Sequence, residues 1–263
     1  VHFAAATKNI RIGTGVSLAA FYNPIRLAEE IGLLDVLSGG RVNWGAGSGF
    51  DPNEFRVFGI NRDERYTRFR ESVDIVLEAW RSDRFSYQGQ YHQYHDVEVL
   101  PKPVQNPMPV WLAASSPEAS IWSGENGFAI MQDPHTSMRG IESKREMYEH
   151  ALKENGHEAG KRDIPVARLL AIADTDEQAK QIAIKGAEWT TSSYAKRPPS
   201  KHSEEVNPVE RYVNDVILWG SPERVADVLQ RYEEEYRLNY LLCSPLSNQS
   251  FHLFNEVVLP RLT

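Results

Sequence analysis

The sequence predicts an α/β protein in which parallel strands alternate with helices. Short apolar runs rich in β-branched residues are followed, again and again, by longer segments with helical periodicity. A helix between successive strands is the pattern of βαβ units, which build a parallel sheet. The chain has 263 residues, a length that one α/β barrel fills. From these observations alone the sheet is either an open doubly wound sheet or a closed barrel.

The first part of the chain begins with residues that resemble the last turn of a helix, and a predicted strand and a predicted helix follow. The first residue is Val1 rather than Met, so we expect the N-terminus to be truncated. Residues 10–18 alternate and are β-branched, which predicts a strand. Asn23 and Pro24 predict a helix to Leu37, because proline suits a first helical turn. Further elements are predicted as strands over 41–45 and 110–114, a helix over about 63–81 and a polar surface hairpin over 87–97.

The second part begins at Ser115–Glu118, where hydroxyl groups, a proline and an acidic residue predict a helix start. The elements predicted after it are strands over 128–131, 165–173 and 239–244, and helices to about 124, over 138–155, over 179–194 and over 221–236. Residues 195–207, with two adjacent prolines and many polar side chains, predict either a plain loop or an active-site lid.

Composition excludes several classes of function. The net charge is −7 and no stretch gathers Lys and Arg, which disfavours binding to nucleic acid. No apolar run of about 18 residues and no signal-peptide pattern is visible, so we expect no membrane segment and a cytoplasmic protein. Cys243 is the single cysteine, which rules out intrachain disulfides and a thiolate cluster. His92 and His95 lack a third ligand, so no metal site is predicted.

Candidate ligand-binding positions lie where strands end and helices begin, because barrels and open α/β sheets bind ligands at the carboxyl ends of their strands. These junctions are small and hydroxylic, and they are residues 14–16, 45–49, 114–117 and 132–135. Glycine and serine at a helix N-terminus let backbone N–H groups approach an anion, which indicates a phosphate-bearing ligand. The same residues are also typical of simple helix capping, and both interpretations stay open at this point.

The junctions disfavour hydrolase chemistry. A barrel glycosidase needs two carboxylates at strand ends, and Asp133 is the one that is clearly placed. Ser48 lacks the spacing of a nucleophile elbow, and the glycines around it do not match a dinucleotide fingerprint.

A more specific signal comes from motifs that follow one another along the chain. They are residues 7–15, 23–30, 34–41, 53–59, 101–107 and 253–262. In this order they resemble the signatures of the bacterial luciferase-like, flavin-dependent monooxygenase family, and the resemblance covers essentially the whole chain. It implies a single domain over residues 1–263 with the TIM (β/α)8 barrel fold, in which the first two βα units are missing from this chain.

The resemblance implies a flavin ring beside the first two junctions. Gly15 and Val16 match a bulge, often with a non-proline cis peptide, that lies against the isoalloxazine ring. Gly47 and Ser48 match positions near the ring and phosphate. Bacterial luciferase has a reactive cysteine and an arginine at these positions, whereas this chain has neither that thiol nor that cation there.

The resemblance also implies a phosphate cradle. Ser115, Ser116 and the backbone of Ala119 match the cradle at a helix N-terminus, and Tyr66 matches a region where some relatives direct side chains toward the phosphate. Apart from the resemblance, the position of His135 on a strand-end loop makes it a candidate for the substrate pocket, and a purely structural role stays open. The family commonly carries a catalytic histidine after its second strand, which is missing here, so no catalytic residue is assigned.

The implied reaction is oxidation of a small organic substrate by O2, with reduced FMN supplied by a separate flavin reductase, in an enzyme that is expected to be a homodimer. Hydride transfer with the deazaflavin F420 in the same fold is one alternative. A non-catalytic barrel subunit is another, and a fragment that does not close its fold unaided is a third.

Overall fold

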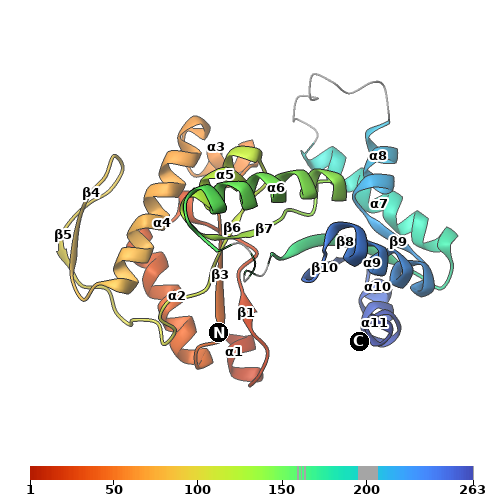
Figure 1. Cartoon of the computed structure of the whole chain (residues 1–263), viewed down its shortest axis with the longest axis horizontal. Coiled ribbons are helices and arrows are strands. Elements are labelled where there is room, and N and C mark those ends of the chain that lie inside the picture. The colour runs from red at the N-terminus through yellow and green to blue at the C-terminus, as the bar shows by residue number, and fades with distance from the viewer. Residues whose placement is uncertain (159, 161, 163, 195–206, 263) are drawn as a thin grey trace. The chain divides into compact units, whose positions relative to one another are not determined.

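The computed structural model describes residues 1–158, 160, 162, 164–194 and 207–262 (Figure 1). The chain divides into two compact units, Val1–Ala113 and Ala114–Thr263, and each is described by itself. Of the predicted loop at 195–207, all but Asn207 lies outside the described residues.

The sheet of the first unit is centred on β3 (Val42–Gly47), which is buried along its whole length. β1 (Ile12–Gly13) and β2 (Ser17–Leu18) pair with β3 in parallel, and so does β6 (Val110–Ala113). Burial on both faces is usual for a parallel strand between neighbours. The strand predicted over 10–18 is therefore two short strands, because residues 14–16 leave the ladder, with a cis peptide bond between Gly15 and Val16.

The helices of the first unit follow the predicted pattern. Asn23 caps α2 (Pro24–Ser38) by accepting hydrogen bonds from two backbone N–H groups, and Gly39 ends this helix with φ of 69°. α4 (Arg65–Arg81) buries an apolar stripe that includes Phe69 and Val73. The other elements are α1 (His2–Ala6), η1 (Ala19–Phe21), α3 (Pro52–Val57), η2 (Arg62–Glu64) and an antiparallel hairpin of β4 (Phe85–Gln88) and β5 (Gln93–Val97).

The second unit is built around another parallel strand, β8 (Val166–Ile172). It pairs in parallel with β10 (Leu241–Pro245) and with β9 (Leu218–Gly220). Gln132, directly after β7 (Ala129–Met131), forms a parallel bridge to the first residue of β8. β8 therefore lies between β9 and β10 in this sheet and is also bridged by the residue that follows β7.

Helices cover β8 through an apolar cluster. Its side chains Val166, Leu170 and Ile172 pack with residues of α6 (Met138–Glu154) and α9 (Pro222–Tyr236). The other helices of this unit are α5 (Pro117–Glu125), α7 (Asp176–Tyr194), α8 (Pro208–Asp215), α10 (Asn248–Leu253), the π-helix η3 (Phe254–Val258) and α11 (Leu259–Leu262). Among the described helices, none is long and apolar enough to cross a membrane.

Candidate functional site

The first unit brings Gly15, Val16 and Gly47 together at the end of its central strand. A Cβ built on Gly47 would lie 2.6 Å from Cγ2 of Val16 and 3.5 Å from the Cβ of Ala113. Real Cβ atoms do not approach so closely, so this position of β3 fits a residue without a side chain. A Cβ on Gly15, in contrast, meets nothing within 4 Å. The backbone at Gly15 therefore borders open space into which a flat ligand can approach.

Thr14 fixes the backbone that leads into this group. Its Oγ1 donates to the carbonyl oxygen of Gly45 at 2.7 Å and accepts from the Gly45 N–H at 3.0 Å. One hydroxyl thus replaces the ladder contacts that the chain gives up between β1 and β2. Ser48, directly after β3, is half-buried, and its hydroxyl donates to the carbonyl oxygen of Gly49 at 3.5 Å.

Tyr66 stands on the first turn of α4 and is half-buried. Its hydroxyl accepts a hydrogen bond from Arg65 at 2.8 Å, and the Arg65 guanidinium lies 4.4 Å from the centre of its ring. The neighbouring side chains Arg65 and Tyr66 therefore contact each other through a hydrogen bond and a cation–π contact. Their role toward a phosphate stays a prediction.

In the second unit, Ser115, Ser116 and Ala119 lie together at the N-terminus of α5. The Ser116 hydroxyl oxygen accepts from the Ala119 N–H at 3.2 Å, and Ser115 is exposed. Pro117 occupies the first helical position, where a missing N–H costs nothing. The predicted cradle is thus a real capped helix start that faces solvent.

The electrostatics of this helix start favour an anion. Hydrogen bonds from its own backbone N–H and from the Ser116 hydroxyl hold the pKa of the Glu118 carboxyl below its usual value. The helix dipole acts in the same direction. Groups that stabilise a carboxylate here have the donor chemistry that a phosphate requires, so the residues present fit the phosphate of a flavin nucleotide.

His135 lies on the loop that follows β7. Its backbone N–H donates to Asp133 Oδ1 at 2.9 Å, and its ring contacts the hydroxyl of Tyr212 on α8. Thr136 donates to the same carboxylate at 2.9 Å. Asp133 therefore accepts hydrogen bonds from two residues of this loop, and the His135 ring contacts α8.

The Asp133 side chain is 17% exposed, and its carboxylate remains ionised. Burial by itself would raise its pKa, but the Lys144 ammonium at 2.8 Å and hydrogen bonds from His135 and Thr136 bring the pKa below its usual value. Lys144 is itself only 5% exposed. A paired and hydrogen-bonded charge of this kind is the form in which proteins tolerate buried ions.

Lys144 was missed at the level of sequence, although α6 carries a signal for it. The buried positions of this helix include Ile141, Arg145, Tyr148 and Leu152, and Lys144 falls on the same stripe. A lysine on an apolar stripe is rarely buried unless it is paired. Periodicity therefore indicates that Lys144 has a partner, but it cannot say which carboxylate that partner is.

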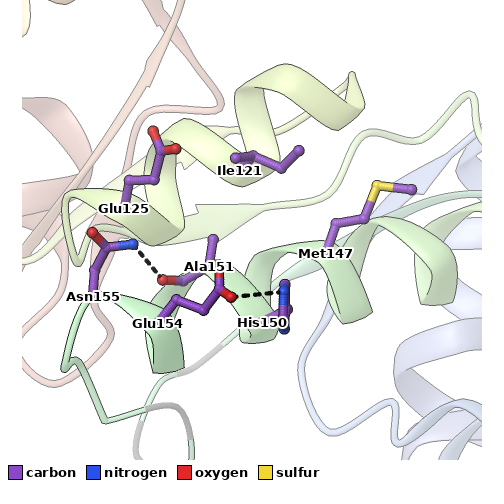
Figure 2. Close-up of a pocket in the computed structure, with 7 residues that line it drawn as sticks. All are labelled: Ile121, Glu125, Met147, His150, Ala151, Glu154 and Asn155. Atoms are coloured by element: carbon purple, nitrogen blue, oxygen red, sulfur yellow. Dashed lines mark hydrogen bonds and ion pairs between the residues drawn. The ribbon is translucent and has the colours of Figure 1, made fainter.

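A hollow of about 250 Å³ lies between α5 and α6, and Figure 2 shows the residues around it. It is lined by Ile121, Glu125, Met147, His150, Ala151, Glu154 and Asn155. The His150 ring pairs with Glu154 at 3.3 Å, and the Asn155 amide donates to the Ala151 carbonyl at 2.9 Å. The hollow occupies the later turns of both helices, so it does not coincide with the predicted positions at the start of α5.

Comparisons with known proteins agree with these observations. A family model described as luciferase-like monooxygenase matches residues 2–237. An F420-dependent glucose-6-phosphate dehydrogenase of Amycolatopsis mediterranei is 29% identical, over 98% of this chain and 81% of that protein. The oxygenase component of a flavin-dependent trigonelline monooxygenase of Acinetobacter baylyi is 29% identical, over 68% of this chain and 51% of that protein.

The crystal structure of a monooxygenase from Streptomyces bottropensis superimposes with a TM-score of 0.82. It is 24% identical and aligns over 99% of this chain and 80% of that chain. This likeness, together with the parallel strands of both units, confirms the predicted α/β fold class.

Proposed function

The chain belongs to the luciferase-like monooxygenase family, whose fold is a TIM barrel and whose members are oxidoreductases. From that premise we propose that this enzyme binds reduced FMN and uses O2 to oxidise a small organic substrate. A flavin reductase supplies the reduced FMN, in line with the oxygenase-component name of the Acinetobacter relative.

The observation that carries this proposal is the start of α5. Ser116 donates toward one carboxylate, caps the helix and stands beside the exposed Ser115. We assign the FMN phosphate to Ser115, Ser116 and the backbone of Ala119, with the Glu118 side chain turning aside. In the first unit, Tyr66 is proposed separately as a cofactor-binding residue through its hydroxyl. Reduced FMN supplies the two electrons that activate O2.

The ring of the flavin is assigned to the first unit. The open space beside Gly15 and the tight contact of Val16 with Gly47 support a flat, apolar surface at this point. In the proposal these residues and Ser48 hold the ring, exclude water from one of its faces and orient it toward the substrate. His135 borders the substrate, and no residue is assigned as the catalytic acid or base.

Hydride transfer with F420 is the second candidate function. It is favoured by the Amycolatopsis relative, an F420-dependent enzyme that aligns over 98% of this chain. F420 also carries a phosphate, so the start of α5 is compatible with either cofactor.

An anaerobic fluorescence titration of the full chain with reduced FMN and with reduced F420 distinguishes the two candidate functions. Tight binding of reduced FMN, and slower reoxidation of bound than of free FMN when O2 is admitted, would support the monooxygenase. Preference for F420 would move the assignment to hydride transfer. Binding of neither cofactor would leave a non-catalytic subunit.

We also propose that the enzyme is a homodimer. In the first unit, Leu33, Val36 and Leu37 are exposed on α2 and, at spacings of three and four residues, share one helix face. An apolar face of this kind is suited to a copy of itself. Sedimentation of the wild type and of Leu37→Glu tests the proposal, since a dimeric wild type and a monomeric variant are expected.

A further inference from the structure

Lys144 uses its ammonium group to connect two loops at the strand ends of the second unit. Its Nζ donates to Asp133 Oδ2 at 2.8 Å, to the Ala114 carbonyl oxygen at 3.2 Å and to Thr136 Oγ1 at 3.3 Å. An ammonium has three hydrogens, so these contacts use its full capacity. The side chain is therefore fixed in position.

One of these contacts reaches the predicted phosphate cradle. Ala114 is 0% exposed and immediately precedes Ser115 and Ser116. Its N–H donates to the Met131 carbonyl at 2.9 Å, so both backbone polar groups of Ala114 are held. The segment that leads into the cradle therefore starts from a fixed residue.

The other two contacts reach the loop that carries His135. Asp133 receives the His135 N–H at 2.9 Å, and Thr136 donates to Asp133 as well as accepting from Lys144. Removal of the ammonium would free the Ala114 carbonyl oxygen and would leave the partly buried Asp133 carboxylate without its counter-charge. A single side chain thus contacts both loops.

We propose that Lys144 is a positioning residue that holds the phosphate loop at Ala114–Ala119 and the His135 loop in one fixed arrangement. The inference rests on the proposed function of the α5 start as a phosphate cradle. Lys144 does not touch the cofactor in this proposal. It acts through Ala114 on the cofactor side and through Asp133 on the substrate side.

A matched control is available on the same helix. Arg145 is also 5% exposed, and its guanidinium donates to the backbone carbonyls of Tyr236 and Arg237. Its partners belong to the end of α9 and, through Glu142 and Glu149, to α6 itself, rather than to the strand-end loops. Arg145→Met therefore removes a buried cation from α6 without releasing the phosphate loop.

The test compares dissociation constants of reduced FMN and reduced riboflavin, which differ by the phosphate, in full-length wild type, Lys144→Met and Arg145→Met. We expect Lys144→Met to weaken FMN about tenfold and riboflavin less than about twofold, since hydrogen bonds to a charged group are involved. Arg145→Met should leave the ratio of the two constants unchanged. An unchanged ratio in Lys144→Met, or equal losses in both variants, would overturn the inference.

A wild type that does not prefer FMN to riboflavin would instead contradict the phosphate cradle itself, so the two failures are distinguishable. If Lys144→Met does not fold, the Lys144→Met/Asp133→Asn double variant, which leaves no unpaired buried charge, replaces it. The same loss of FMN preference is expected in the double variant, and retention of the preference would refute the positioning role.

Discussion

The two units hold their candidate residues by different physical means. In the first unit Gly47 and Val16 meet at a distance that leaves no room for a methyl group. In the second unit the buried Lys144 and the partly buried Asp133 are opposite charges that contact loops through hydrogen bonds. Steric contact depends on shape alone, whereas a buried ion pair depends on the presence and protonation of both partners. The two regions should therefore respond to different substitutions and to different conditions.

The largest effect is expected for the buried charge pair. Lys144→Met leaves the Asp133 carboxylate without its counter-charge, and we expect a loss of about 3–5 kcal/mol in the free energy of unfolding. The Lys144→Met/Asp133→Asn double variant should lose much less than the sum of the two single variants, because it leaves no unpaired ion. Urea unfolding monitored by tryptophan fluorescence measures these values. Additive losses would show that the two side chains do not stabilise each other.

A steric effect of intermediate size is expected in the first unit. Gly47→Ala places a Cβ 2.6 Å from Val16 Cγ2, and overpacking of this kind costs about 1–3 kcal/mol. Val16→Ala removes the atom that clashes, so the Gly47→Ala/Val16→Ala double variant should recover part of the loss. Thermal unfolding of the three variants tests this. If Val16→Ala gives no recovery, the close contact is not what limits residue size at position 47.

The cap of α5 should give a smaller loss of stability and a specific loss of binding. Ser116→Ala removes the hydroxyl that accepts from the Ala119 N–H, at a cost of about 1 kcal/mol. Ser137→Ala is the matched control, since Ser137 caps α6 in the same way through the Gly140 N–H. Calorimetry should show similar losses for both, while FMN affinity falls in Ser116→Ala alone. Equal FMN affinity in both variants would contradict the phosphate assignment.

Local patterns in the sequence were sufficient to predict the α/β class and its longer elements, whereas the barrel was implied by the family resemblance. The helix over Arg65–Arg81 and the strand β8 were predicted within a few residues, since each has a periodic apolar face and clear end signals. The short elements α3 and β9 were missed, because six and three residues are too few to establish a period. The local pattern of residues 10–18 did not show the break between β1 and β2, because the Thr14 hydroxyl that replaces the ladder acts across 31 positions of sequence. The family resemblance did imply a bulge with a cis peptide at Gly15 and Val16, and the structure has that cis peptide.

The candidate site was predicted less completely for the same reason. Ser116 and Ala119 carry a local capping signal, and the structure places them together at a helix start. The contact of Lys144 with Ala114 spans 30 positions and that with Asp133 spans 11. Such pairings depend on tertiary packing, which one sequence does not encode in any local pattern.

A modest effect with a distinct pH dependence is expected for Tyr148 in the second unit. Its buried hydroxyl donates to the Phe128 carbonyl oxygen at 2.8 Å, and burial raises its pKa to about 12. The folded pKa is above the unfolded value of about 10, so the neutral phenol stabilises the fold below pH 10. That contribution is lost as pH rises from about 10 toward 12.

Tyr148→Phe removes both the hydrogen bond and the ionisable group. We expect a cost of about 1 kcal/mol at neutral pH and a shallower decline in stability above pH 10 than in the wild type. Urea unfolding at several alkaline pH values measures the two slopes. Identical slopes would mean that this phenol does not contribute to alkaline unfolding. The proposed difference between the two units, steric contact in the first and buried polar groups in the second, would then be weakened.

The smallest effect on stability, and the sharpest test of the comparison, is expected for Gly15→Ala. A Cβ at this position meets nothing within 4 Å, so the free energy of unfolding should change by less than about 1 kcal/mol. If the flavin ring occupies the open space beside Gly15, the added methyl group should weaken reduced FMN and reduced riboflavin equally, because both carry the same ring. Ser116→Ala, in contrast, should weaken FMN alone. Unchanged affinity of Gly15→Ala for both flavins would contradict the assignment of the ring to the first unit. Equal losses of affinity at unchanged stability would support a ring site that depends on shape, distinct from a phosphate site that depends on charge.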